Sequence, residues 1–219
     1  MMIPKNMTYD LRRVRRAIRT GAAVVLTVSA PALADHPGDR LDEVTAAKEP
    51  TFEPAERHPP ALRLRTVDGG AFDLRDLEDE VVVLSFVPDG CGIPCADQQA
   101  MLAEVREAID ITPMRDMVAF VTVSSPGSPI ASDRHGPDWL GVTPRDEHAV
   151  SEAAAEWAKL SRRDGEAPMA YVLDRGARHA GIFHGAAFAR INMVLYVNGL
   201  TNAHPPEPGL LDRIRDLLR

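Results

Sequence analysis

Two short runs of apolar, mostly β-branched residues stand out in the hydrophobic pattern of this 219-residue chain, at residues 81–87 and 117–123. Both are too short for a typical helix and do not alternate with polar residues, so they predict strands that are buried on both faces. Between them, residues 96–109 repeat apolar side chains at helical spacing, which indicates a helix packed against a sheet. A helix that joins two buried strands is typical of a parallel strand-helix-strand unit.

Shorter patterns predict the remaining elements. They are a β-hairpin over 62–74 with its turn at 68–70, a helical turn at 73–77, helices at 147–160, 188–200 and 210–218, and antiparallel strands at 169–173 and 180–184. Residues 124–144 are rich in Ser, Pro, Gly and Asp and predict an irregular loop that contains Trp139 and Leu140. The order of these elements predicts an α/β, thioredoxin-like three-layer fold with a central, mainly parallel sheet flanked by helices.

The N-terminal segment has the pattern of a secretory signal peptide. Five arginines between positions 12 and 19 precede the uncharged apolar stretch 21–31, and Ala32-Leu33-Ala34 is a cleavage signal before Asp35. The apolar stretch is shorter than the roughly 20 residues that span a bilayer. We therefore expect export to a bacterial periplasm with cleavage after Ala34, an uncleaved anchor being the alternative.

These patterns divide the chain into four predicted segments. The signal peptide covers 1–34, and a flexible arm or linker covers 35–58, which is rich in Pro, Asp, Glu and Ala and has no sustained apolar period. The thioredoxin-like domain covers 59–204. A C-terminal amphipathic helix or tail covers 205–219, and its mixed Arg and Asp face favours packing over membrane binding.

The charge of the chain narrows the class of partner. There are 25 Lys and Arg against 32 Asp and Glu, a net charge of −7. Because residues 1–34 hold six Lys or Arg and one Asp, the exported remainder carries a net charge of about −12. Such an acidic protein is poorly suited to nucleic acid or an anionic membrane. We expect a protein partner, with membrane contact only through that partner or an uncleaved signal.

The only two cysteines, Cys91 and Cys95, lie where the strand 81–87 ends and the next helix begins. Backbone N–H groups and the positive end of the helix dipole stabilise a thiolate there, which favours redox chemistry or binding of a soft metal. Their spacing of four brings both sulfurs close enough for a disulfide or a shared ion. A purely structural disulfide is the alternative, but so short a loop stabilises by only about 2 kcal/mol.

Several segments resemble the Sco/SenC family. The most specific is the C-x-x-x-C of Cys91 and Cys95, because general thioredoxins use C-x-x-C. The resemblance covers roughly 59–202, and its other segments are the hairpin turn 68–70, the turn 73–77, the strand 81–86, and residues 112–117, 120–123 and 192–198.

The resemblance implies a thioredoxin-like protein of the periplasm or the mitochondrial intermembrane space. It implies that one copper ion is bound by the two cysteines and a distant histidine, in the assembly of the dinuclear copper centre of cytochrome c oxidase. Family members also reduce the cysteines of the target subunit. This chain departs from the pattern at Glu166, which stands eight residues before Asp174, where the family has its histidine. A carboxylate is a hard ligand and suits Cu(I) poorly.

Pro168 and the strand that follows it resemble a segment of thioredoxin- and TlpA-type thiol reductases. In those proteins a cis proline faces the cysteine pair and presents backbone to a disulfide-linked partner. The alternative is that Pro168 only starts an edge strand. Met169 is near this predicted site and soft enough for Cu(I), whereas His179 and His184 are weaker candidates for a replacement ligand.

The sequence therefore predicts a periplasmic Sco-like protein that acts in assembly of the copper centre of cytochrome c oxidase. Cys91 and Cys95 would be the catalytic, redox-active pair of a thiol-disulfide oxidoreductase, with Cys91 as the more exposed attacking thiolate and Cys95 as the resolving one. One alternative is a copper(I) metallochaperone with Glu166, Met169 or a histidine as substitute third ligand. Others are a general TlpA-like thiol-disulfide reductase and a degenerate member that serves as an interaction module. The expected partner is a cytochrome oxidase subunit or a periplasmic thiol protein.

Overall fold

The computed structural model describes residues 40–66, 69–125, 128, 139–144, 149–165 and 167–202. The strands are β1 (Phe52–Pro54), β2 (Leu64–Thr66), β3 (Ala71–Phe72), β4 (Val81–Val87), β5 (Val118–Ser124), β6 (Trp139–Pro144), β7 (Met169–Asp174) and β8 (Arg178–His184). The helices are α1 (Leu41–Lys48), α2 (Ile93–Asp110), α4 (Ala149–Ala158) and α5 (Arg190–Asn202), with 3-10 turns η2 (Leu74–Leu77) and η3 (Arg115–Met117).

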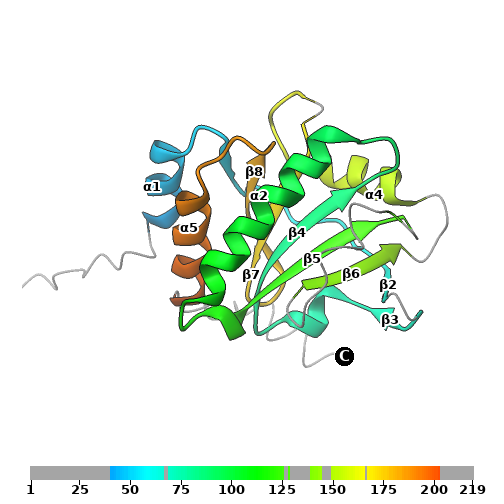
Figure 1. Ribbon diagram of the computed structural model, residues 1–219, viewed down its shortest axis with the longest axis horizontal. Helices are drawn as coiled ribbons and strands as arrows, with labels where there is room; N and C mark the ends of the chain where they lie inside the picture. Colours follow the sequence, from blue (N-terminus) through cyan, green and yellow to red (C-terminus); the bar gives the residue numbers. More distant parts are fainter. Residues whose placement is uncertain are drawn as a thin grey trace, which may run out of the picture. The chain divides into compact units, whose positions relative to one another are not determined.

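The unit β4-α2-β5 forms the centre of the domain, as the hydrophobic pattern predicted. β4 and β5 pair in parallel from Val81 opposite Val118 to Val87 opposite Ser124, and every residue of both strands is buried. Strands that lie between two helical layers need apolar residues on both faces, which explains the unbroken runs. Figure 1 shows α2 running alongside β4, with β5 on the other side of β4.

The sheet is mixed rather than mainly parallel. Among the described residues the sheet has eight strands in the order β1-β8-β7-β4-β5-β6-β2-β3, and only the pairs β4-β5 and β5-β6 are parallel. A short turn joins β7 to β8, and β2 and β3 are close together in the chain, so both pairs are antiparallel. The apolar pattern indicates whether a strand is buried but not its direction. It therefore could not predict that the strands on both sides of β4-β5-β6 are antiparallel.

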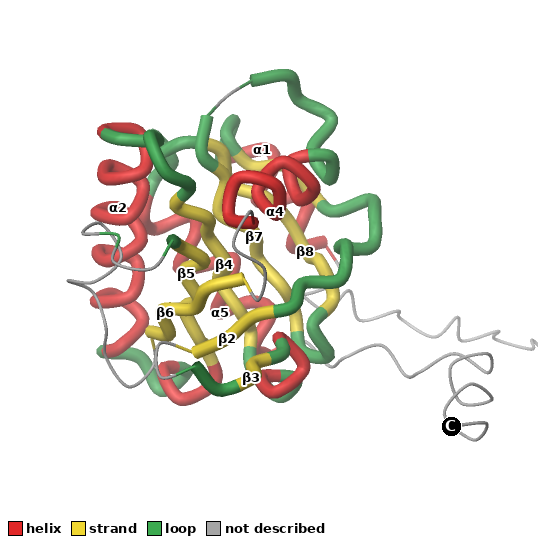
Figure 2. Tube along the Cα trace, turned by 90° about the vertical axis from the view of Figure 1, so that its right-hand side faces the viewer, coloured by secondary structure: helices red, strands yellow, loops and turns green. Residues whose placement is uncertain are grey.

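Two apolar cores cover the two faces of this sheet. Alternate residues of β4 point to opposite sides, with Val81 and Val83 in the core under α2 and α5, and Val82 and Leu84 in the core under α4. Figure 2 shows α4 on the other side of the sheet from α5. The predicted three-layer, thioredoxin-like arrangement is therefore present.

The segment preceding the hairpin differs from the predicted arm. Within 40–58 the chain forms α1 and β1, and β1 pairs with β8 at the edge of the sheet. The carboxylate of Glu53, which is 3% exposed, accepts hydrogen bonds from Ser161 Oγ and the backbone N–H of Arg162, both at 2.7 Å. These partners lie more than 100 positions away in the chain, so the composition of the segment cannot show the contacts. The segment was therefore predicted to be irregular.

The predicted loop at 124–144 also contains regular structure. Its last residues form β6, which pairs in parallel with β5 and buries Trp139 and Val142. The indole N–H of Trp139 donates to Thr122 Oγ1 at 2.9 Å, so the strand is fixed by a buried polar contact as well as by packing. The neighbouring Gly and Pro residues are typical of loops, which is why this six-residue strand was not predicted.

Most other predicted elements are confirmed within one to three residues, including the hairpin, the capped turn after Asp73, α4, the β7-β8 pair and α5. The signal peptide 1–34, the tail helix 210–218 and Glu166 lie outside the described residues. Among the residues that are described, no helix is long and apolar enough to cross a membrane.

Candidate functional site at the cysteine pair

The chain reverses sharply between β4 and α2, and this reversal carries both cysteines. Gly90 and Gly92 have φ angles of +80° and +60°, in the left-handed region that favours glycine. Gly92 is the N-cap residue of α2, and Pro94 lies in its first turn, where a missing N–H costs nothing. Cys91 therefore stands just outside the helix, and Cys95 stands in its first turn.

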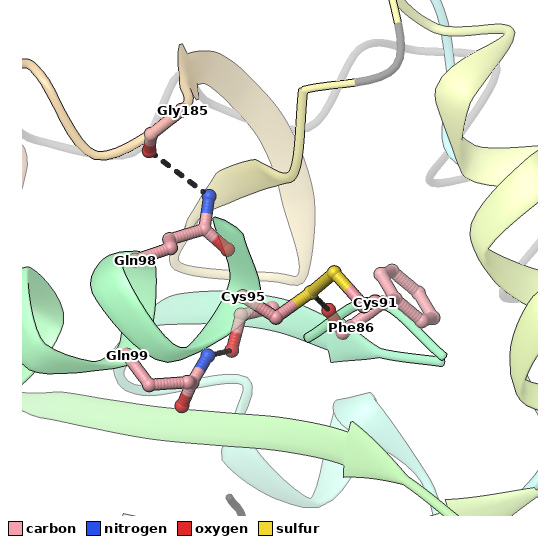
Figure 3. Close-up of a disulfide and its surroundings, with 7 residues drawn as sticks. Phe86, Cys91, Cys95, Gln98, Gln99 and Gly185 are labelled. Carbon is pink, nitrogen blue, oxygen red and sulfur yellow. Dashed lines mark hydrogen bonds between the residues drawn. A yellow bond between two sulfur atoms is a disulfide. The ribbon is translucent and has the colours of Figure 1, made fainter. Parts of the chain in front are cut away.

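The two cysteines form a disulfide, with their Cα atoms 5.7 Å apart (Figure 3). Cys95 is 1% exposed, whereas Cys91 is partly exposed. Cys91 is thus the more exposed of the two cysteines, as predicted. An external thiol or thiolate can therefore reach the sulfur of Cys91 more readily than that of Cys95.

The environment of Cys95 distinguishes it further from Cys91. Its Sγ lies 3.8 Å from the backbone oxygen of Phe86 (Figure 3). Because the sulfur carries no hydrogen in the disulfide, this is a van der Waals contact and not a hydrogen bond. In the reduced protein the same oxygen would accept a hydrogen bond from the Cys95 thiol. Cys95 is thus enclosed by the core and the end of β4, whereas Cys91 stands at the partly exposed reversal.

A cavity of about 350 Å³ opens beside the disulfide. Its lining is mostly apolar and comes from the end of β4, the start of β7, three alanines of α4, and Gly165, Ala167 and Pro168. Cys91, Cys95, Pro168 and Met169 all line this cavity. The structure thus brings together four of the seven residues that the sequence marked as site candidates.

Pro168 faces the cysteine pair, but it is not a cis proline. None of the peptide bonds in the described part of the chain is cis. The edge-strand alternative is also wrong, because β7 lies between β4 and β8 inside the sheet. The loop is held by Gly185, whose N–H donates to the carbonyl of Pro168 at 2.7 Å. Gly185 in turn accepts a hydrogen bond from the side-chain amide of Gln98 at 3.2 Å (Figure 3).

Met169 lines the same cavity as the disulfide. The antiparallel register of β4 and β7 pairs Ser85 with Ala170, so the next step of the register places Met169 beside Phe86. The hydroxyl of Tyr171 donates to Met169 Sδ at 3.3 Å. Burial, with a smaller contribution from the negative charge of Glu53, raises the pKa of Tyr171 well above its ordinary value. The hydroxyl therefore stays protonated and remains a donor.

The two candidate histidines do not join the cysteines. His184 Nε2 lies 3.0 Å from Glu53 Oε2, and His179 Nδ1 lies 3.4 Å from the carbonyl oxygen of Arg57. His184 lines a second, smaller cavity on the other side of Met169. In the part of the chain that the structure describes, no three His, Cys, Asp or Glu side chains are grouped so as to hold a metal ion.

A buried polar network between α2, β4 and β5 was not predicted from the sequence. Gln99 Nε2 donates to Ser85 Oγ at 2.9 Å, and Thr122 Oγ1 donates to Gln99 Oε1 at 3.1 Å. Gln98 and Gln99 are 0% and 1% exposed, although glutamine is usually a surface residue. The available signal was their position in the apolar stripe of α2, where Gln99 stands one turn after Cys95 and one turn before Leu102.

Comparison with known proteins gives matches at the level of structure. No protein-family model matches the chain, and neither does any curated protein. The solved structure of BsSco, described as a member of the Sco family of cytochrome c oxidase assembly proteins, matches with a TM-score of 0.56 at 13% identity, covering 69% of this chain and 98% of that one. A SCO1/SenC family lipoprotein from Bacillus anthracis (TM-score 0.54, 15% identity, 68% and 98% covered) and copper-bound Sco1 from yeast (0.54, 14%, 69% and 92%) are also similar.

The sheet, its two helical layers and the disulfide between β4 and α2 define a thioredoxin-like α/β protein. Within that class, the chain has the fold of the Sco proteins, as the sequence resemblance implied.

Proposed function

We propose that this chain is a periplasmic Sco-like thiol-disulfide protein that acts in assembly of the copper centre of cytochrome c oxidase. The observation that carries the proposal is the placement of the Cys91–Cys95 disulfide at the start of α2, with one sulfur partly exposed and the other buried. The similarity to BsSco, which is described as belonging to a family of oxidase assembly proteins, supports the choice of process. The signal-peptide pattern of residues 1–34 supports the compartment.

The exchange reaction follows from the difference between the two sulfurs. The Cys91 thiolate attacks one sulfur of a partner disulfide, so that a mixed disulfide forms and the other partner sulfur leaves as a thiolate. Cys95 then loses its proton and attacks the sulfur of Cys91. The mixed disulfide breaks, the Cys91–Cys95 disulfide forms and the second partner sulfur leaves. The partner gains two electrons and this protein loses two, so an external dithiol must reduce the protein before the next cycle.

The surroundings of the pair suit this exchange. The N-terminus of α2 lies beside both cysteines and favours a thiolate there, and Cys95 is held next to the Phe86 carbonyl, where it can resolve the mixed disulfide. The cavity beside the pair is lined mostly by apolar side chains. Pro168, held by Gly185, gives the opposite wall a fixed position from which a partner backbone can be recognised.

Delivery of copper(I) as cargo is the second candidate function. Two thiolates at one helix terminus are soft donors suited to Cu(I), and the thioether of Met169 lines the same cavity. That specific placement favours copper delivery over a general TlpA-like thiol reductase. The residues present therefore fit a soft, low-coordinate ion, even though the position of the family histidine holds Glu166.

The proposal is tested in the host and with purified components. Deletion of the gene should lower cytochrome c oxidase activity while the oxidase subunits are still made, and wild-type protein should restore it whereas Cys91→Ser should not. The reduced, signal-free chain should also reduce an oxidised cysteine pair in the copper-binding domain of the oxidase subunit from the same host. Normal oxidase activity in the deletion strain would refute the proposed process. A general reductase would act equally on unrelated disulfide substrates.

A further inference from the structure

We propose that Met169 is the third ligand of a three-sulfur Cu(I) site, formed with Cys91 and Cys95 in the reduced protein. The inference rests on the proposed function, because it requires the cysteine pair to become reduced. It goes further by identifying how this chain holds its cargo without a histidine at the family position. The ligand class is a soft, monovalent ion that prefers two or three sulfur donors.

Two observations place Met169 in the cavity beside the cysteines. Both cysteines and Met169 line one cavity. The register of β4 and β7 also sets Met169 beside Phe86, whose carbonyl oxygen contacts Cys95 Sγ at 3.8 Å. Met169 and the cysteines therefore approach each other from the two sides of the end of β4.

The thioether is held in one orientation by Tyr171. Its hydroxyl donates to Met169 Sδ at 3.3 Å, and the two side chains lie on the same face of β7 because they are two residues apart. A thioether sulfur has two lone pairs. The hydrogen bond occupies one of them, which leaves the other for a metal ion.

The chemistry of the cavity matches Cu(I) better than a harder ion. Two thiolates and a neutral thioether around a monovalent cation leave one net negative charge. A carboxylate as the third ligand would add a second charge to an apolar cavity at a large desolvation cost. His184 is a weaker alternative, because it lines the neighbouring cavity rather than that of the cysteines and its Nε2 contacts Glu53 Oε2 at 3.0 Å.

The binding step balances without a change in the oxidation state of copper. An external dithiol transfers two electrons to the Cys91–Cys95 disulfide and becomes a disulfide, and the two cysteine sulfurs take up two protons. Cu(I), supplied by a small chelator, then displaces these two protons and binds the two thiolates and Met169 Sδ. When the pair then transfers two electrons to a partner disulfide, the Cys91–Cys95 disulfide forms again, the partner becomes a dithiol, and the ion is released.

The test compares Met169→Leu with Met101→Leu in the reduced chain without its signal peptide. Leucine is close to methionine in volume, so both changes are mild for the fold. Met101 lies on α2 and packs against the core on the other face of the sheet, which makes Met101→Leu a matched control. Cu(I) affinity is measured anaerobically against a competing chelator, the number of sulfur neighbours is measured by X-ray absorption at the copper edge, and the reduction potential of the pair is measured on the same samples.

We expect three sulfur neighbours in the wild type and in Met101→Leu, and two in Met169→Leu. We expect Met169→Leu to weaken Cu(I) binding by about tenfold or more, the lower end of what loss of a residue that supports a metal site costs. The reduction potential should be the same in all three proteins, which shows that Met169→Leu keeps the fold and the disulfide.

Wild-type affinity and three sulfurs in Met169→Leu would overturn the assignment, as would two sulfurs with an oxygen or nitrogen in the wild type. Failure of the wild type to bind Cu(I) would overturn it too, and would leave disulfide exchange untouched. Failure of disulfide exchange would instead refute the proposed function.

Discussion

The side-chain amide of Gln98 donates a hydrogen bond to the backbone carbonyl of Gly185 at 3.2 Å, across the end of the sheet. The N–H of Gly185 donates to the carbonyl of Pro168 at 2.7 Å. The helix that carries Cys95 therefore also positions the loop that forms the opposite wall of the cavity. The disulfide and its facing loop are coupled through one fully buried side chain.

Replacing Gln98 with glutamate should disrupt this link in a pH-dependent way. At pH 7 a buried carboxylate would face the Gly185 carbonyl and lower the unfolding free energy by about 3 kcal/mol or more. Burial raises the pKa of such a carboxyl in the folded protein, and its protonated form can donate to Gly185. The loss relative to wild type should therefore shrink as the pH falls toward 5 and grow as it rises to 7.

Urea unfolding at both pH values measures this effect. Ala100→Glu places the same carboxylate on the exposed face of α2 and should change stability by no more than about 0.5 kcal/mol. Equal losses for Gln98→Glu and Ala100→Glu would show that the contact with Gly185 does not matter.

The two cysteines should give different single variants. Cys95→Ser leaves the more exposed thiol without a resolving partner, so it should accumulate a mixed disulfide with an oxidised target peptide. Cys91→Ser leaves only the sulfur that is 1% exposed, and it should form little or no adduct. Mass spectrometry of intact protein distinguishes the two, with the double serine variant as the blank. Adduct formation by Cys91→Ser at the rate of Cys95→Ser would reverse the assigned roles.

Acid should weaken the attachment of β1 to the domain. Burial acts to raise the pKa of Glu53, but hydrogen bonds from the Arg162 N–H, the Ser161 hydroxyl and His184 outweigh it and lower that pKa. Burial, together with the positive charge of Arg163, lowers the pKa of His184 by more than its contact with Glu53 raises it. Both groups bind protons more weakly in the folded protein than in the unfolded chain. Above about pH 6.5 their contribution to the unfolding free energy should be full. As the pH falls below that value, the histidine is protonated more readily in the unfolded chain than in the folded protein, and stability falls. A second loss should follow at lower pH, where the same holds for the carboxyl group of Glu53.

Unfolding free energies measured from pH 7.5 to pH 4 test whether stability falls in these two steps. Glu53→Gln removes the titrating carboxylate and should flatten the decline at the acid end, although the variant is less stable at pH 7. Burial raises the pKa of Asp42, so that group opposes the decline near pH 4 in both proteins. An unchanged slope in Glu53→Gln would show that another group controls acid stability.

The hydroxyl of Thr122 should matter more than its small size suggests. It donates to Gln99 Oε1 and accepts from the indole N–H of Trp139, within 3.1 Å in both cases. Thr122→Val keeps the shape but removes both of these hydrogen bonds from a buried site, which should lower the unfolding free energy by about 2–4 kcal/mol. The same change at Thr143, which is partly buried on β6, should cost less than half as much. Comparable midpoints for the two variants in urea would contradict this view of the network.

The parts of the molecule that the sequence predicted are those with a local signal. The runs of β4 and β5 and the stripe of α2 reflect burial that repeats with the period of each element, and the glycines around Cys91 mark the reversal. The edge strand β1 gave no such signal, because Glu53 is satisfied by Ser161 and Arg162 from a distant part of the chain. Contacts between distant residues set the trans Pro168 loop and the glutamine network as well.

The reduction potential of the Cys91–Cys95 pair, measured by equilibrium with glutathione or dithiothreitol on the signal-free chain, tests the central claim most directly. A redox-active pair with one accessible sulfur should have a potential above about −300 mV and exchange readily with small thiols. A potential well below that value, with exchange only after unfolding, would identify a structural disulfide and contradict the proposed thiol-disulfide function.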